Sequence, residues 1–290
     1  MNEDFRIPVG QWAADGIDWL TSTLSAVFGL IRSVLAALYD GSELVFTAPP
    51  FWAVIIALAV IAFLASGWKL ALGTVLGLGL IVGMDTDQWE NAMSTIALVL
   101  VAALVATILA IPLGIWMARN NTVAMIVRPV LDFMQTMPAF VYLIPAVVLF
   151  RVGVVPGIVA TIVFAMAPGV RFTSLGIRQV DKEVVEAGHA FGASPRRILR
   201  QVQIPLALPT IMGGINQVIM LALSMVVIAG MVGAPGLGQP VVQALQTVNV
   251  GLGVEAGLSV VILAMYLDRV TAALGDRAPV AKALKAQAGG

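Results

Sequence analysis

Cysteine is absent from the 290-residue sequence, and histidine occurs once, at His189. Without cysteine the chain can form no disulfide and no thiolate metal site, and a single histidine cannot supply the cluster of ligands that a zinc or iron centre needs. Charged residues amount to only 11%, and the formal net charge is zero. A chain with this charge balance is not expected to bind nucleic acid. The sequence therefore predicts no metal site and no cofactor held by this chain itself.

The first ten residues also lack the features of a cleavable signal, because they are acidic and contain neither a basic segment nor an apolar core. Hydrophobic residues, in contrast, make up 60% of the chain, and the mean hydropathy is +0.98. This composition lies far outside the usual balance of soluble domains. We therefore expect an all-α integral membrane protein that is targeted by its internal spans.

Apolar runs that approach the roughly 20 residues needed to cross a bilayer recur along the chain. They predict about seven transmembrane helices, at residues 51–67, 70–84, 92–117, 136–152, 154–174, 206–232 and 250–267. Only Trp68 and Lys69 separate the first two runs. Because the two runs together are too long for one span, we expect two short helices there.

The basic residues indicate how these spans are oriented, because lysine and arginine favour the cytoplasmic side of a membrane. With seven spans and an external N-terminus, 13 of the 16 basic residues lie inside and 3 lie outside. The opposite orientation would invert this distribution. We therefore expect the N-terminus outside and the C-terminus in the cytoplasm.

An amphipathic pattern precedes the first span. Apolar residues recur at intervals of three and four over residues 17–39, at Ile17, Leu20, Leu24, Phe28, Ile31, Leu35 and Leu38. The polar residues between them favour a helix that lies at the membrane interface. The alternative is an eighth membrane helix that carries Arg32, which would place the N-terminus on the other side.

A polar, basic segment interrupts the apolar chain at residues 186–205, EAGHAFGASPRRILRQVQIP. Asp181 can cap a short helix, Gly192 can end it with a positive φ, and Ser194 with Pro195 can begin a second helix. The segment is therefore expected to fold as a helix, a glycine turn and a second helix. An ordinary positively charged cytoplasmic loop would explain the arginines, but not the spacing of the other residues.

That spacing resembles the EAA loop by which permease subunits of ABC importers dock onto their ATPase. The matching positions are Glu186, Ala187, Gly188, Gly192 and Pro205, with Gly188 in place of the usual third alanine. The resemblance extends over about residues 85–270. Segments 131–150, 155–177, 191–217 and 221–239 are similar to the permease of the glycine betaine/proline betaine importers.

The resemblance implies a type I ABC importer permease fold in the plasma membrane of a prokaryote. It implies a permease homodimer surrounded by membrane lipid, a cytoplasmic ABC ATPase that binds ATP and Mg, an external substrate-binding protein, and a role in osmoprotection. The chain itself would be a transport subunit and not an enzyme. Open alternatives are a permease for choline, carnitine or an amino acid, and an ion-driven secondary transporter, which would leave the loop unexplained.

Five residues are candidates for the substrate pathway, namely Met134, Met137, Phe140, Tyr142 and Asn216. The first four could attract a quaternary ammonium group through soft and aromatic surfaces, although helix packing explains them equally well. The expected organisation is an external N-terminal segment (1–48), two short membrane helices (49–84), a permease core (85–270) with the coupling loop at about 175–205, and a cytoplasmic tail (271–290).

Overall fold

The computed structural model describes residues 8–276, and within them it contains helices and no strand. The helices are α1 (Val9–Thr23), α2 (Ser25–Thr47), α3 (Phe51–Ser66), α4 (Trp68–Met84), α5 (Thr86–Arg119), α6 (Asn121–Thr136), α7 (Phe140–Phe150), α8 (Val154–Arg178), α9 (Lys182–Ala190), α10 (Pro195–Ile198), α11 (Ile204–Gly230), α12 (Gly238–Thr247) and α13 (Val250–Asp276). A π-helical turn, Leu199–Gln203, joins α10 to α11. Most of the expected tail lies outside the described residues.

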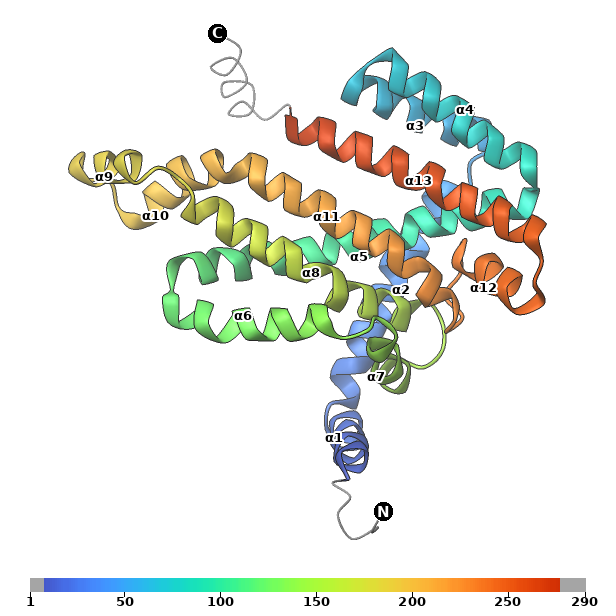
Figure 1. The fold of residues 1–290 in the computed structure, drawn as a ribbon, viewed down its shortest axis with the longest axis horizontal. Coiled ribbons are helices and arrows are strands. Elements are labelled where there is room, and N and C mark those ends of the chain that lie inside the picture. The colour runs from blue at the N-terminus through green and yellow to red at the C-terminus, as the bar shows by residue number, and fades with distance from the viewer. Residues whose placement is uncertain (1–7, 277–290) are drawn as a thin grey trace.

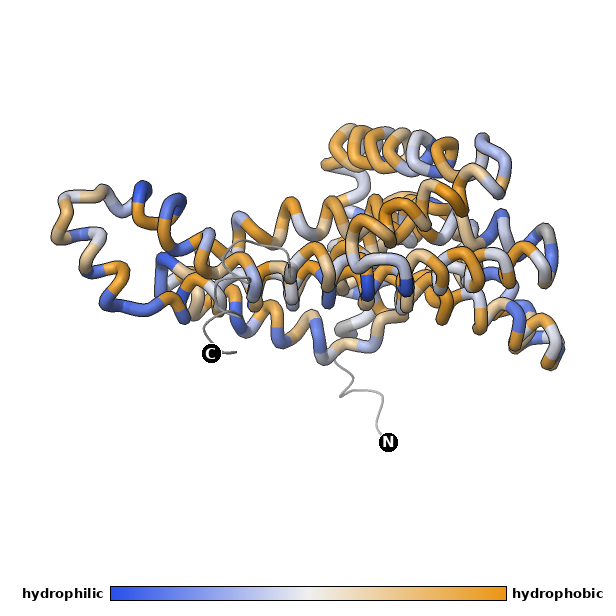
Figure 2. The backbone as a smooth tube through the Cα atoms, turned by 90° about the horizontal axis from the view of Figure 1, so that it is seen from above, coloured by the Kyte–Doolittle hydropathy of each residue, from blue (hydrophilic) through white to orange (hydrophobic). Residues whose placement is uncertain are grey.

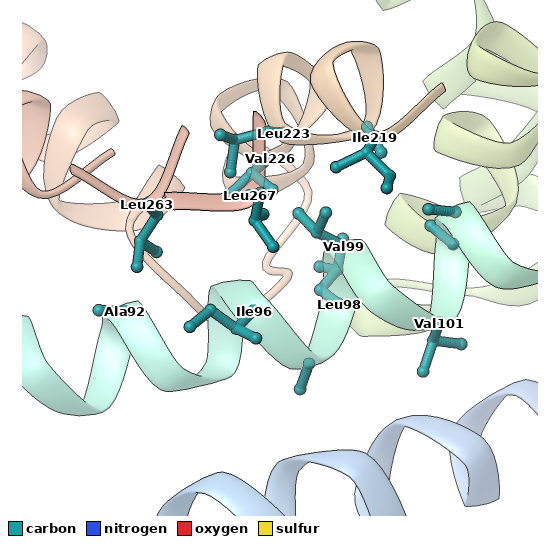
Figure 3. Close-up of a cluster of buried hydrophobic side chains, with 14 of the residues drawn as sticks. Ala92, Ile96, Leu98, Val99, Val101, Ile219, Leu223, Val226, Leu263 and Leu267 are labelled. Atoms are coloured by element: carbon teal, nitrogen blue, oxygen red, sulfur yellow. The ribbon is translucent and has the colours of Figure 1, made fainter. Parts of the chain in front are cut away.

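The long helices α5, α8 and α11 form the centre of the molecule and run side by side (Figure 1). Small residues let them approach closely, as packing between membrane helices requires. A Cβ atom at Gly169 of α8 would lie 2.9 Å from the Cβ of Ala110 and 3.1 Å from Val218. At the other end of α5, Ile96 and Val99 lie in one apolar cluster with residues of α11 and α13, including Leu223 and Leu263 (Figure 3).

Four helical stretches of the described chain are long and apolar enough to cross a membrane alone, and up to six if each of two bent pairs counts as one span. The four are α5, α8, the stretch from Pro195 to Gly230, and α13. The middle of the molecule is hydrophobic, whereas hydrophilic residues gather at the end formed by α9 and α10 (Figure 2). The all-helical membrane fold expected from the sequence is confirmed.

The helices α3 and α4 form the hairpin expected from the two short apolar runs, with 16 and 17 residues. Gly67 reverses the chain between them with a φ of +86°, which glycine adopts without strain. The hairpin packs beside α13 (Figure 1), and the Tyr266 hydroxyl of α13 donates a hydrogen bond of 3.2 Å to the Leu58 carbonyl of α3.

The single span expected at residues 136–152 is wrong. The structure has only α7 there, which is 11 residues long, and α6, which ends at Thr136, is bent by 100° relative to it. Met137 between them has an extended backbone, with φ −72° and ψ 137°. The physical reason is Pro138, because proline disfavours the helical conformation in the residue before it. This broken pair therefore replaces one straight span in the expected order of seven.

The amphipathic helix expected at residues 17–39 is also corrected. Two helices, α1 and α2, meet there at an angle of 80°, and α2 continues to Thr47. The face of α2 that packs on the core contains the buried residues Leu35 and Tyr39, while Ile31 and Leu38 of the expected apolar stripe are exposed. Figure 1 shows α2 crossing the direction of α5 and α8 at a steep angle. Arg32 is exposed on this crossing helix.

Candidate functional site

The first half of the basic segment folds as the sequence predicts. The Asp181 carboxylate accepts a 2.9 Å hydrogen bond from the Glu183 amide and so caps the N-terminus of α9. At the other end Gly192 has a φ of +76°. The Gly192 amide donates to the His189 carbonyl at 2.9 Å and the Ala193 amide donates to the Gly188 carbonyl at 3.1 Å. This pair of bonds is a Schellman motif, which ends a helix and satisfies its last carbonyls.

The second half begins at Ser194, whose extended backbone precedes Pro195 at the start of α10. The Ser194 side chain forms no capping bond; its carbonyl accepts the amides of Arg197 and Ile198 instead. The second helix begins where the sequence predicts, and α10 continues through the π-helical turn into α11. Within that turn the Ile204 amide donates to the Leu199 carbonyl. Pro205 follows directly, and because its ring cannot pack against a regular preceding turn, a wider local turn is favoured.

We call residues 181–198 the α9–α10 loop. Gly188 is the point at which its two helices touch, since a Cβ atom there would lie 3.3 Å from Cγ1 of Ile198. Glu186 and Ala187 are exposed on α9, and Pro205 is half-buried at the start of α11. Four of the five predicted loop residues therefore lie on α9 or its turn, and Pro205 lies in the helix that follows.

Phe191 is the residue of this loop that sequence reasoning missed. Its side chain is 92% exposed, although phenylalanine usually contributes to a core. Phe191 lies directly before the Gly192 turn, at the C-terminal end of α9. The helix α9 lies at the end of the molecule farthest from α12 (Figure 1). The sequence does contain a signal for this exposure, because Phe191 is an aromatic residue in a polar loop with no neighbours in the sequence that could bury it. An exposed aromatic side chain of this kind is suited to insertion into another surface.

Behind α9 lies a cleft of about 330 Å³, lined by charged residues that include Arg119, Arg178, Lys182 and Glu186. The Arg178 guanidinium donates to the Met117 carbonyl at 2.7 Å and to Oδ1 of Asn121 at 3.1 Å. These bonds fasten the end of α8 to the turn between α5 and α6. The α9–α10 loop is thus attached to the core through both α8 and α11.

The four aromatic and methionine candidates for the substrate pathway lie around the break between α6 and α7. The Tyr142 hydroxyl donates a hydrogen bond to the Met134 carbonyl, and its ring centroid lies 6.3 Å from that of Phe164. Met134 and Met137 are half-buried, and Phe140 is exposed. The structure therefore brings Met134, Met137, Phe140 and Tyr142 into one region.

Asn216 does not join them. Its Nδ2 donates a 2.9 Å hydrogen bond to Oδ1 of Asp268, and its Oδ1 accepts a bond from the Thr271 hydroxyl, so it links α11 to α13. In Figure 1, α13 and α6 lie on opposite sides of α8 and α11. The polar side chain of Asn216 thus has a bonding role between helices.

The glycine-rich connection after α11 is tightly packed. The Leu237 amide donates a 2.8 Å hydrogen bond to the Thr95 hydroxyl of α5. Gly236, with a φ of +114°, leaves no room for a Cβ atom beside the same threonine. The glycines of this connection therefore serve close packing against α5.

A helical membrane core with an exposed helix–turn–helix loop at one end is the architecture expected of the permease of a type I ABC importer. A solved structure described as inward-facing conformations of the MetNI methionine ABC transporter matches this chain with a TM-score of 0.61, at 22% identity, over 70% of this chain and 98% of that chain. This likeness supports the fold alone.

The chain belongs to the family described as "Binding-protein-dependent transport system inner membrane component", whose model matches residues 110–278. It is 46% identical to the glycine betaine/proline betaine transport system permease protein ProW of Escherichia coli strain K12, over 93% of this chain and 75% of ProW. It is 48% identical to the glycine betaine/carnitine transport permease protein GbuB of Listeria monocytogenes, over 94% of this chain and 97% of GbuB.

Proposed function

We propose that the chain is the permease subunit of an ATP-driven importer for glycine betaine, proline betaine or a related compatible solute. The exposed α9–α10 loop, which continues without a break into a membrane-spanning helix, is the observation that carries the coupling role. The relatives at 46% and 48% identity are permeases for glycine betaine with proline betaine or carnitine, which supports the substrate class.

The structure suggests how a partner ATPase would act on this chain. Phe191 and the exposed face of α9 offer a surface to a cytoplasmic ABC ATPase, which binds ATP and Mg. Movement of the loop passes directly to α11, because α10, the π-helical turn and α11 are continuous. The helix α11 packs against α8, α13 and α5, so its displacement rearranges the centre of the permease.

The proposed assembly contains two copies of the chain, two ATPases and an external substrate-binding protein. Closed two-fold symmetry is the simplest arrangement for a chain with one coupling loop and two ATPases to engage. Under the proposed orientation the N-terminus is outside and the α9–α10 loop is in the cytoplasm of a prokaryotic cell. Lipid surrounds the exposed apolar side chains of the spans.

Substrate passage is proposed for the region around the α6–α7 break. Tyr142 and Phe140 there provide aromatic surfaces that can attract a quaternary ammonium cation, and Met134 and Met137 provide soft ones. Asn216 remains a pathway candidate only because it is half-buried and lines a cavity of about 200 Å³.

Uptake into membrane vesicles tests this function. Vesicles with the complete transporter are expected to accumulate labelled glycine betaine when ATP is present, with carnitine and choline as competitors. Uptake that depends on an ion gradient and not on ATP would overturn the coupling role. ATP-driven uptake of methionine with no response to betaine would overturn the substrate class while the permease role remained.

A further inference from the structure

An apolar groove of about 250 Å³ lies between α4 and α13, away from the α9–α10 loop and from the α6–α7 break. Gly77 and Ile262 form its closed end, because a Cβ atom on Gly77 would lie only 2.9 Å from Cγ2 of Ile262. One turn earlier, at Gly73, nothing lies within 4 Å of the same position, so the helices have separated. From Gly77 to Leu70 the groove is about 10 Å long, at 1.5 Å per helical residue.

The surroundings of this groove are those of a surface that faces lipid. Leu76 of α4 is 65% exposed and Met265 of α13 is also exposed, although both are large apolar residues. In water such a surface would be unfavourable, whereas acyl chains solvate it at no cost. The natural occupant of the groove is therefore a hydrocarbon chain.

The open end of the groove carries positive charge. Arg269 lines it beside Leu70, and Lys69, which directly precedes Leu70, is exposed. Neither side chain forms a salt bridge within the described residues. Trp68 at the same end is 64% exposed, as expected of an indole at the membrane interface. Apolar walls below two cations fit an amphiphile whose head group is anionic.

We propose that this groove binds an anionic phospholipid, with one acyl chain along Gly73 and Gly77 and the phosphate between Lys69 and Arg269. The C-terminal end of α13 points toward the end of the molecule that carries the α9–α10 loop (Figure 1). The lipid therefore belongs to the leaflet on the loop side. That this is the cytoplasmic leaflet rests on the orientation in the proposed function, whereas lipid binding itself does not.

Native mass spectrometry of the full-length chain tests the proposal, after mild detergent extraction and addition of phosphatidylglycerol or phosphatidylcholine. The wild-type chain is expected to retain phosphatidylglycerol in preference to phosphatidylcholine. The double variant Lys69→Ala, Arg269→Ala is expected to lose this preference. The retention of phosphatidylglycerol relative to phosphatidylcholine is expected to fall about fivefold for each cation removed. Glycerol phosphate, which has the head-group charge without the chain, is not expected to displace the lipid.

Three further variants distinguish an effect on the groove from general effects of substitution. Gly73→Leu is expected to fill the groove and reduce lipid retention, because open space surrounds this position. Gly79→Leu is the matched control, since it lies on the same helix in open space but does not line the groove. Arg32→Ala controls for the loss of an exposed cation elsewhere.

Equal retention of the two lipids by the wild-type chain would overturn the proposal, as would unchanged retention in the double variant. The same spectra report how many copies of the chain associate. If Gly73→Leu abolished a dimer and left lipid retention intact, the groove would be an interface between copies, and the lipid assignment would be wrong.

Discussion

Single residues determine the geometry of the α9–α10 loop. Gly192 provides the positive φ that ends α9, and Gly188 provides the close contact with Ile198 that folds α10 back against α9. These two glycines have different physical roles. Gly192 is required by its backbone conformation, with nothing within 4 Å of a Cβ atom, whereas Gly188 has an ordinary helical backbone and a close neighbour.

Gly192→Val is therefore expected to disturb the loop through the backbone alone. A β-branched residue in the left-handed region costs roughly 1–3 kcal/mol and would break the Schellman motif. Since 1.4 kcal/mol corresponds to about tenfold, a cost in this range is expected to lower uptake about fivefold or more while membrane insertion is unchanged. Gly257→Val is the matched control, because this glycine also has open space but no positive φ. Wild-type uptake in Gly192→Val would contradict the role of the turn.

Phe191 is expected to anchor the partner ATPase. Phe191→Ala removes the side chain most exposed at the end of the loop and leaves the Gly192 turn intact. Truncation of an aromatic anchor typically costs about 2 kcal/mol or more, so the ATPase is expected to dissociate about 30-fold more readily. Pull-down of the ATPase from detergent-solubilised membranes measures this. Leu104→Ala is the control, because Leu104 is a 57% exposed apolar residue of the spanning helix α5. Equal recovery with Phe191→Ala would show that docking occurs elsewhere.

At the scale of elements, α2 is joined to the core by a polar contact that apolar patterning does not reveal. The Glu43 carboxylate accepts hydrogen bonds from the Tyr39 hydroxyl at 2.6 Å and from the Ser94 hydroxyl of α5 at 2.7 Å. Both Tyr39 and Ser94 are buried. The helix α2 is therefore held to α5 through one carboxylate as well as through its apolar face.

Glu43→Ala is expected to loosen α2, because it leaves two buried hydroxyl groups without their acceptor. Each unsatisfied buried group costs about 1–3 kcal/mol, and the effect appears as a lower thermal midpoint of the chain in detergent. Glu43→Gln keeps an acceptor and is expected to lie between the wild type and Glu43→Ala. Asp40→Ala, on the same helix and exposed, is expected to leave the midpoint unchanged. A midpoint in Glu43→Ala equal to that of Asp40→Ala would rule out the anchoring contact.

For the whole molecule, signals within a few residues predicted several helices and turns, whereas features that depend on tertiary contacts could not be predicted from the sequence. The α3–α4 hairpin follows from two short apolar runs, and the helix–turn–helix of the loop follows from the cap at Asp181 and from Gly192, because these signals act within a few residues. The break at Pro138 was missed because its apolar surroundings resemble a continuous span. The packing of α2 on α5 was not predicted because it depends on where α5 lies, and the exposure of Phe191 depends on the absence of a nearby surface.

The orientation of the whole molecule can be tested with single cysteines, because the sequence contains none. Asp87 near the start of α5 and Arg197 in α10 are both exposed. The start of α5 and the helix α10 lie at opposite ends of the long axis (Figure 1). If the distribution of lysine and arginine reports the orientation correctly, the α9–α10 loop is inside, and Asp87→Cys is expected to react with an impermeant maleimide in intact cells. Arg197→Cys is expected to react only after permeabilisation. Labelling of Arg197→Cys in intact cells, with Asp87→Cys protected, would invert the topology and place the α9–α10 loop where no cytoplasmic ATPase could reach it.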